Sequence, residues 1–239
     1  MRSLDLFSCV GCHAIGFERA GIETVAFCEK NEFRRAILKR HFPGIEVHYD
    51  VCTITAPLAD IVIGGPPCQR TSVASAISGN RSGESLWRFM RSICNAVRPQ
   101  WIVVEQPPGN SEWETEVASD LCRIGYHNSR IEFAACDIGA PYPRRRVFIL
   151  ASTSLPRLEV AWRAVPSAIE SVKRSANART DWDADKLGAL RVDARSAGEM
   201  DKSRSRERKE RIEALGDSNP PHMAEVIGRA IVRASGHDI

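Results

Sequence analysis

The residue best suited to covalent chemistry stands in a short loop behind an apolar segment. The run Gly64-Gly65-Pro66-Pro67-Cys68-Gln69 follows the segment Asp60–Ile63. A thiolate is a strong nucleophile, and the two prolines restrict the backbone just before Cys68. Most single cysteines are inert buried thiols. A cysteine in a glycine- and proline-rich loop at the end of a strand nevertheless favours the interpretation of Cys68 as a nucleophile.

A carboxyl group follows the next apolar run. Glu105 comes directly after Trp101–Val104. In an open α/β sheet the carboxyl ends of the parallel strands border the ligand crevice, so we expect Glu105 at the same edge as Cys68. A carboxyl group in that position is a candidate proton donor. The alternative is an acid that caps a loop or pairs with an arginine.

Two arginines precede a further apolar run. Arg144 and Arg146 occupy alternate positions in front of Val147–Ala151. Because alternate residues of a strand point to the same side, both guanidinium groups can face one site. Without Cys68 and Glu105 in the same chain, we would interpret them as a solvated basic corner.

The amino-terminal segment has features of a cofactor site. Gly11 follows the apolar run Ser3–Phe7, where a glycine lets a ligand approach the backbone and a helix amino-terminus offers free N–H groups. Glu29 ends the next apolar run, where an acid can bind ribose hydroxyls. Together they fit an adenosine-containing ligand, although Gly11 could instead only ease a tight turn.

A haem site and a metal site are both rejected. The run Cys9-Val10-Gly11-Cys12-His13 matches the Cys-x-x-Cys-His pattern of covalent haem attachment. It lies inside a strand-turn-helix pattern, and no export signal accompanies it. No second cysteine or histidine pair stands at a spacing that suits zinc, so we expect no metal.

The elements that position these groups alternate along the chain, which predicts an α/β fold with a doubly wound sheet, right-handed crossovers and helices on both faces. The expected strands are Ser3–Phe7, Thr24–Cys28, Asp60–Ile63, Trp101–Glu105 and Val147–Ala151, and the expected helices are Ala14–Ala20, Glu32–His41, Ser85–Val97 and Glu114–Ile124.

The pattern changes near residue 152. The stretch Ser154–Arg211 has few apolar runs and many charges, with Trp162, Leu187 and Leu190 as its obvious anchors. A helical period returns from Arg211 to Ile231. We therefore expect a catalytic domain over 1–152, a small inserted lobe over 153–210, and a carboxy-terminal helix over 211–239 that returns to the first domain.

Composition fits a soluble globular protein. The 239 residues are 43% hydrophobic and 26% charged, and no apolar run reaches the roughly 20 residues that a membrane span needs. We expect a cytoplasmic protein without a membrane partner, whose cysteines are reduced thiols. The net charge of +3 is small, but basic clusters at Pro143–Arg146 and Lys202–Arg211 are compatible with a nucleic acid partner.

In order and kind, the motifs resemble those of the cytosine-C5 DNA methyltransferase family. They cover residues 1 to about 151 and again 211–231, and leave 153–210 unmatched. In the family, that insertion is the target-recognition region. Here it is short, as in compact phage or prophage enzymes. The matching motifs are Asp5-Leu6-Phe7 with Gly11, Glu29, Asp50-Val51, Gly64 to Gln69, Glu84-Ser85-Leu86, Glu105, Arg144 to Arg146 and Gly216 to Pro221.

The resemblance implies an S-adenosylmethionine-dependent, Rossmann-like sheet and a DNA (cytosine-5-)-methyltransferase of restriction-modification or phage type. Cys68 would add to carbon 6 of a flipped-out cytosine, Glu105 would stabilise a proton on ring nitrogen 3, and Arg144 and Arg146 would hold Glu105 and the base. The substrate would be double-stranded DNA, and the protein a monomer. The implied cofactor contacts are Phe7, Gly11, Glu29, Asp50, Val51, Leu86, Asp217 and Ser218, with Pro67 between cofactor and base.

The chain departs from the family pattern at several positions. Cys9 and Cys12 stand where glycine is usual, Gln106 replaces asparagine, Tyr142 replaces glutamine and Asp217 replaces the asparagine of the closing motif. Two other functions stay open. The chain could methylate cytosine in transfer RNA, or it could be a catalytically inactive relative that binds DNA.

Overall fold

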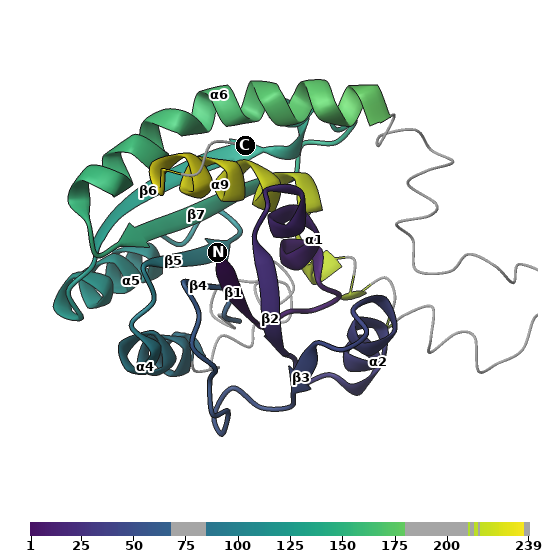
Figure 1. Ribbon diagram of the computed structural model, residues 1–239, viewed down its shortest axis with the longest axis vertical. Coiled ribbons are helices and arrows are strands. Elements are labelled where there is room, and N and C mark those ends of the chain that lie inside the picture. The colour runs from purple at the N-terminus through teal and green to yellow at the C-terminus, as the bar shows by residue number, and fades with distance from the viewer. Residues whose placement is uncertain (68–84, 180–209, 211–212, 215, 237–239) are drawn as a thin grey trace, which may run out of the picture.

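The core of the protein is one mixed seven-stranded sheet with the strand order β3-β2-β1-β4-β5-β7-β6 (Figure 1). The computed structural model describes residues 1–67, 85–179, 210, 213–214 and 216–236. In this part of the chain, no helix has both the length and the apolar character needed to cross a membrane.

Five strands run parallel. They are β1 (Arg2–Leu6), β2 (Glu23–Cys28), β3 (Glu46–His48), β4 (Ile61–Gly64) and β5 (Trp101–Gln106). The strand β7 (Arg145–Ser152) enters antiparallel between β5 and β6 (His127–Ala134). The α/β fold class is confirmed, but the antiparallel β7 and the strands β3 and β6 were not anticipated.

Helices cover both faces of the sheet because the strands alternate their apolar side chains. In β5, Trp101 and Val103 face one hydrophobic cluster, and Ile102 and Val104 face the other. The first cluster is covered by α1 (Cys12–Arg19), α6 (Leu155–Arg179) and α9 (Pro221–Ala234). The second is covered by α4 (Trp87–Val97) and α5 (Ser111–Arg123) (Figure 1).

The helix α2 (Glu32–His41) packs over β2 and β3 through a smaller cluster of Ala14, Phe27 and Leu38. The side chain of Asn31 caps its amino-terminus by accepting from the backbone N–H of Arg34. Phe42, at its end, packs against Phe27.

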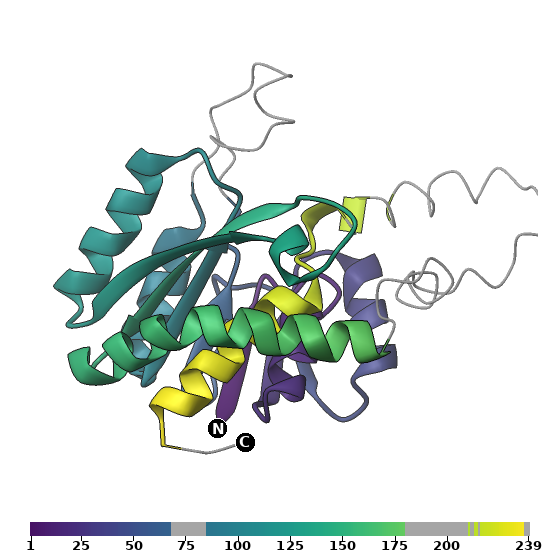
Figure 2. The ribbon, with the colours of Figure 1, turned by 90° about the horizontal axis from the view of Figure 1, so that it is seen from above.

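The helices α6 and α9 lie side by side on the sheet (Figures 1 and 2). We expected residues 153–210 to form a separate lobe, but the described part of that range is a helix whose Leu158, Ala161 and Val172 are buried in the main core. The expected anchor Trp162 is half exposed instead. The sequence did not reveal this helix because its buried face consists largely of alanine, which gives a weak hydrophobic signal.

The closing part of the chain is interrupted where the sequence period indicated one continuous helix. We expected one helix from Arg211, and the described residues Glu210, Glu213, Ala214, Gly216 and Asp217 are helical. Residues 218–220 are not, and α9 begins at Pro221, which occupies its first turn. Nearly all of its residues are buried, because it runs between α1 and α6. Gly16 of α1 makes this close approach possible, since an added Cβ would lie 2.2 Å from the carbonyl oxygen of Pro221.

Candidate active site

A cavity of about 460 Å³ opens at the carboxyl ends of β1, β2, β4 and β5. This is where the crevice of an open α/β sheet is expected. It gathers nine of the predicted site residues, which the sequence spreads over more than two hundred positions. These are Phe7, Glu29, Asp50, Val51, Pro67, Leu86, Glu105, Arg146 and Asp217.

Glu29 holds two turns together at the end of β2. Its Oε2 accepts the backbone N–H of Cys9 at 2.8 Å, and its Oε1 accepts that of Asn31 at 2.7 Å. Burial raises the pKa of this carboxyl group, although both hydrogen bonds and the charge of Arg34 oppose the shift. The carboxylate is thus fixed at the cavity wall, and each oxygen retains acceptor capacity.

The turn from β1 to α1 has an unusual backbone. Phe7 and Cys9 have φ angles of 56° and 50°, and Gly11 has 84°. A Cβ at Gly11 would lie 2.4 Å from the Phe42 ring. Gly11 therefore serves the packing of α1 against α2, and it lines neither this cavity nor the smaller pocket described below.

The segment before α9 closes the turn from the other side. The thiol of Cys9 lies 3.3 Å from the hydroxyl of Ser218, and Ser218 donates to the carbonyl of Ala214 at 2.5 Å. Asp217 pairs with Arg34 of α2 at 2.6 Å. Cys9 and Asp217, which both differ from the usual family residues, therefore have a related role, because both help to attach the segment before α9 to the rest of the fold.

Arg144 and Arg146 have different partners. The Nε of Arg146 lies 2.6 Å from Oε1 of Glu105, in an ion pair whose members are both largely buried. Arg144 instead donates to the backbone carbonyls of Gly216 and Ser218. We expected both arginines to hold Glu105, but only Arg146 contacts it, and Arg144 secures the closing segment.

Glu105 and the residue after it sit against the loop that follows β4. A Cβ on Gly65 would lie 2.9 Å from Oε2 of Glu105, so the glycine leaves room for the carboxylate. Gln106, which sequence reasoning treated only as a departure, donates from Nε2 to the carbonyl of Pro66 at 2.6 Å. This bond fixes the backbone two residues before Cys68.

Cys68 itself lies outside the described residues. The residues that flank positions 68–84 do meet at the cavity edge, because the N–H of Leu86 donates to the carbonyl of Pro67 at 3.3 Å. Asp50 also lines the cavity, where its carboxylate accepts the N–H of Cys52, and this bond lowers the pKa of Asp50.

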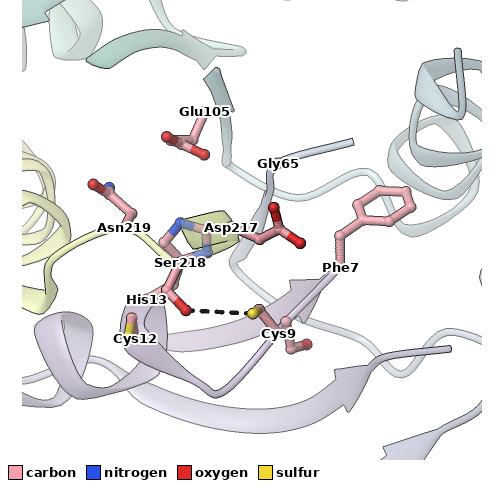
Figure 3. A pocket seen from close by; sticks show the side chains of 10 residues that line it. Phe7, Cys9, Cys12, His13, Gly65, Glu105, Asp217, Ser218 and Asn219 are labelled. Atoms are coloured by element: carbon pink, nitrogen blue, oxygen red, sulfur yellow. Dashed lines mark hydrogen bonds between the residues drawn. The ribbon is translucent and has the colours of Figure 1, made fainter. Parts of the chain in front are cut away.

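A second, smaller pocket lies beneath Glu105 (Figure 3). His13 of α1 and Asn219, which precedes α9, line it together with Cys12 and Ser218. Sequence reasoning missed both His13 and Asn219. His13 was noticed only as part of the rejected haem pattern, and Asn219 was noticed only as part of the closing motif from Gly216 to Pro221, without a role in the site.

Thiols near the site are weakly ionised. Burial raises the pKa of Cys12 to about 12, with the charge of Cys9 as a further cause, and burial also raises that of Cys28 to about 12. Every cysteine in the described ranges is free. Within the same ranges, no group of three or more histidine, cysteine and acidic residues is arranged to hold a metal ion.

Comparison with known proteins gives a consistent result. The family model for the C-5 cytosine-specific DNA methylase matches residues 1–188. Among curated proteins, the type II methyltransferase M2.BsuMI of Bacillus subtilis (strain 168) is 32% identical over 163 residues, which are 64% of this chain and 42% of that protein. The chain thus spans less than half the length of this relative.

Solved structures share the fold. A prophage-encoded E. coli protein described as a DNA modification methyltransferase superposes with a TM-score of 0.53 at 24% identity, over 64% of this chain and 46% of the other. DNMT2 of Spodoptera frugiperda gives a TM-score of 0.52 at 19% identity, over 64% of this chain and 50% of the other. At such identities the likeness concerns the fold alone.

Proposed function

This chain belongs to the C-5 cytosine-specific DNA methylase family, and from that premise we propose that it transfers a methyl group from S-adenosylmethionine to carbon 5 of cytosine in double-stranded DNA. One observation carries the proposal. Glu29, at the end of β2, and Glu105, at the end of β5, line the same cavity as Pro67, the neighbour of Cys68.

The residues of the cavity fit the cofactor. A volume of about 460 Å³ is in the range of small-molecule and cofactor sites. Phe7, Val51 and Leu86 give apolar surface for a purine ring, and the fixed Glu29 carboxylate offers acceptors for ribose hydroxyls. Asp50 adds a second acidic group, and Asp217 and Ser218 belong to the segment that closes the site. When bound, S-adenosylmethionine supplies an electrophilic methyl group on a sulfonium.

Cys68 and Glu105 would make carbon 5 reactive. The Cys68 thiolate forms a bond to carbon 6 of cytosine, while Glu105 gives a proton to ring nitrogen 3. The ring electrons then form a double bond between carbons 4 and 5, and carbon 5 becomes an enamine nucleophile. After methylation, a water molecule acting as a base takes the carbon-5 proton, the double bond between carbons 5 and 6 forms again, and the thiolate leaves carbon 6. The nitrogen-3 proton returns to Glu105.

The other residues would position these two groups. Arg146 holds Glu105 by its ion pair, and Gln106 holds the loop that leads to Cys68. Arg144 secures the segment containing Asp217 and Ser218. Gly11 contributes indirectly, by letting α1 and α2 meet beside the cofactor turn.

The substrate must leave the duplex to react. A stacked base cannot reach an enclosed site, so the target cytosine would be flipped out, at a cost of a few kcal/mol. The target-recognition role expected of 153–210 would fall to residues 180–209, because α6 belongs to the main core. We propose a monomer, acting in the cytoplasm of a bacterium or phage-infected cell, in restriction-modification or in marking phage DNA.

Trapping tests this chemistry directly. The purified chain is incubated with S-adenosylmethionine and a random-sequence duplex in which 5-fluorocytosine replaces cytosine. Fluorine cannot leave as a proton does, so elimination stops and the adduct between Cys68 and carbon 6 persists on a denaturing gel. Cys68→Ala should give no adduct, and Cys122→Ala, at an exposed thiol, should give as much as wild type.

The same assay with a fluorinated transfer RNA separates the two nucleic acids. An adduct on DNA supports the proposal. An adduct on RNA alone, an adduct that Cys68→Ala still forms, or no adduct with either substrate contradicts it.

A further inference from the structure

The small pocket beneath Glu105 has the properties of a built water site. It has a volume of about 30 Å³, more than the space that one water molecule needs. Among the residues that line it, His13 and Asn219 carry three buried polar atoms without a hydrogen-bond partner among the described residues, which are Nε2 of His13 and Nδ2 and Oδ1 of Asn219. Glu105 lines the pocket as well, and its Oε1 has the ion pair with Arg146 but no hydrogen bond.

These side chains come from three different parts of the fold. His13 projects from α1, Asn219 from the segment before α9, and Glu105 from the end of β5, and Figure 3 shows them around the same pocket. His13 is 7% exposed, Asn219 3% and Glu105 7%. Buried polar groups in folded proteins nearly always have a protein or water partner, and a buried water typically makes about three hydrogen bonds.

The far side of the histidine is held by an acid. Nδ1 of His13 lies 3.4 Å from Oδ1 of Asp5, a β1 residue with no exposed surface. Because Asp5 engages Nδ1, the other ring nitrogen is available to the pocket. Burial lowers the pKa of His13, but the hydrogen bond and charge of Asp5, with the added charge of Glu105, outweigh it and raise the pKa overall.

Other charges near this pair are few. Arg146 is the cation that opposes protonation of His13, and it is paired with Glu105. Cys12 is held as a neutral thiol, and Arg144 is committed to backbone carbonyls. The imidazolium is therefore favoured by acids on two sides, one on β1 and one on β5.

We propose that water in this pocket connects His13 to Glu105, so that the Asp5–His13 pair is a proton relay for the active-site carboxyl group. This inference rests on the proposed function. A proton leaves Nε2 of the imidazolium, the water accepts it and releases another to the Glu105 carboxylate, and the resulting carboxylic acid can protonate cytosine nitrogen 3. When the thiolate is expelled, the proton returns by the same route, and none is consumed.

The first test needs no turnover. The imidazole of His13 is titrated by NMR in the wild type and in Glu105→Gln, with the exposed His127 as an internal reference. A lower pKa of His13 in the variant, with that of His127 unchanged, is the expected result. An unchanged His13 pKa would overturn the relay, whatever substrate the protein methylates.

The second test uses the pH dependence of kcat for methyl transfer. In wild type, the relay requires the imidazolium, so the rate should fall as the pH rises through the pKa of His13. His13→Gln removes the relay, and Asn219→Val breaks the water site but keeps the histidine. Both variants should lose the fall in kcat at rising pH. At lower pH, both should be about tenfold to hundredfold slower than the wild type, which is at or below the lower end of the rate effects of general acid–base catalysis.

The control for this profile is His127→Gln, which should reproduce the wild-type curve. If His13→Gln and Asn219→Val lower the rate by the same factor at every pH, with the shape of the profile unchanged, the residues are structural and the relay is wrong. If no cytosine in DNA or RNA is methylated at all, the proposed function fails, and the NMR titration alone decides on the coupling between His13 and Glu105.

Discussion

Replacing Glu29 with glutamine should destabilise the protein even when no ligand is bound. The carboxylate accepts two backbone N–H groups, from Cys9 at 2.8 Å and Asn31 at 2.7 Å. A glutamine side chain has one oxygen, so one of these donors would face an amide N–H₂. Losing a hydrogen bond to a charged group costs about 1.5–3 kcal/mol.

Part of that cost is offset, because the neutral amide avoids the burial penalty that raises the pKa of Glu29. A net loss of about 1–2 kcal/mol remains at neutral pH, which corresponds to a melting temperature lower by about 2–8 °C for a chain of this size. The measurement is thermal unfolding followed by circular dichroism, with the exposed Glu18→Gln on α1 as the matched control.

The stability difference between the wild type and Glu29→Gln should depend on pH in a definite direction. A carboxyl group whose folded pKa is raised contributes stability that is present below its unfolded value of 4.5 and is lost as the pH rises through the folded value. The stability difference between wild type and Glu29→Gln should therefore narrow as the pH rises above 4.5. If Glu29→Gln has the same melting temperature as the wild type in the absence of ligand, the Glu29 carboxylate does not organise the turn.

Three other perturbations test the packing and the thiols. Gly16→Ala should lower the free energy of unfolding, measured in urea, by about 1–3 kcal/mol, because the added methyl group overpacks α1 against α9. Gly216→Ala is the control, because its added Cβ would have open space around it. Equal stability of the two variants would contradict the close approach of α1 and α9. Arg229→Met removes the 2.7 Å partner of the fully buried Glu225 and should lower both the melting temperature and the free energy of unfolding. The loss of free energy should be less than the roughly 3–5 kcal/mol expected for a sole partner, because Arg19 and Arg179 remain. Arg233→Met serves as the control, and identical melting of the two variants would refute this prediction. At pH 7.5 iodoacetamide should alkylate the exposed Cys122 well before Cys12. The pKa of about 12 leaves Cys12 about a thousandfold less thiolate than the ordinary cysteine value of 9.0 would. Comparable labelling of the two cysteines, measured by peptide mass spectrometry, would show that burial does not suppress the ionisation of Cys12.

The sequence was most informative where strands end. Glu29 and Glu105 follow short apolar runs, and parallel strands bring such ends together at one edge, so their shared cavity followed from the pattern. The helix Glu32–His41 was also predicted at its observed bounds. Its local end signals, which are the capping residue Asn31 and the basic residues of the last turn, mark the same helix ends as the folded structure.

Features that depend on distant contacts were not predictable. The helix α6 hides its buried face in alanines, which carry a weak hydrophobic signal, and it contains Pro166. The role of Gly11 depends on the Phe42 ring more than thirty residues away, and the partner of Arg144 comes from the segment before α9. The orphaned atoms of His13 and Asn219 become visible only when α1 and α9 are placed side by side.

The most direct test of the account is methylation itself. The purified chain is incubated with unmethylated duplex DNA and methyl-labelled S-adenosylmethionine, beside Cys68→Ala, and the DNA is digested for nucleoside mass spectrometry. We predict labelled 5-methylcytosine with the wild type and none with Cys68→Ala. Label on another base, label that persists in Cys68→Ala, or label that enters transfer RNA but not DNA would contradict the account.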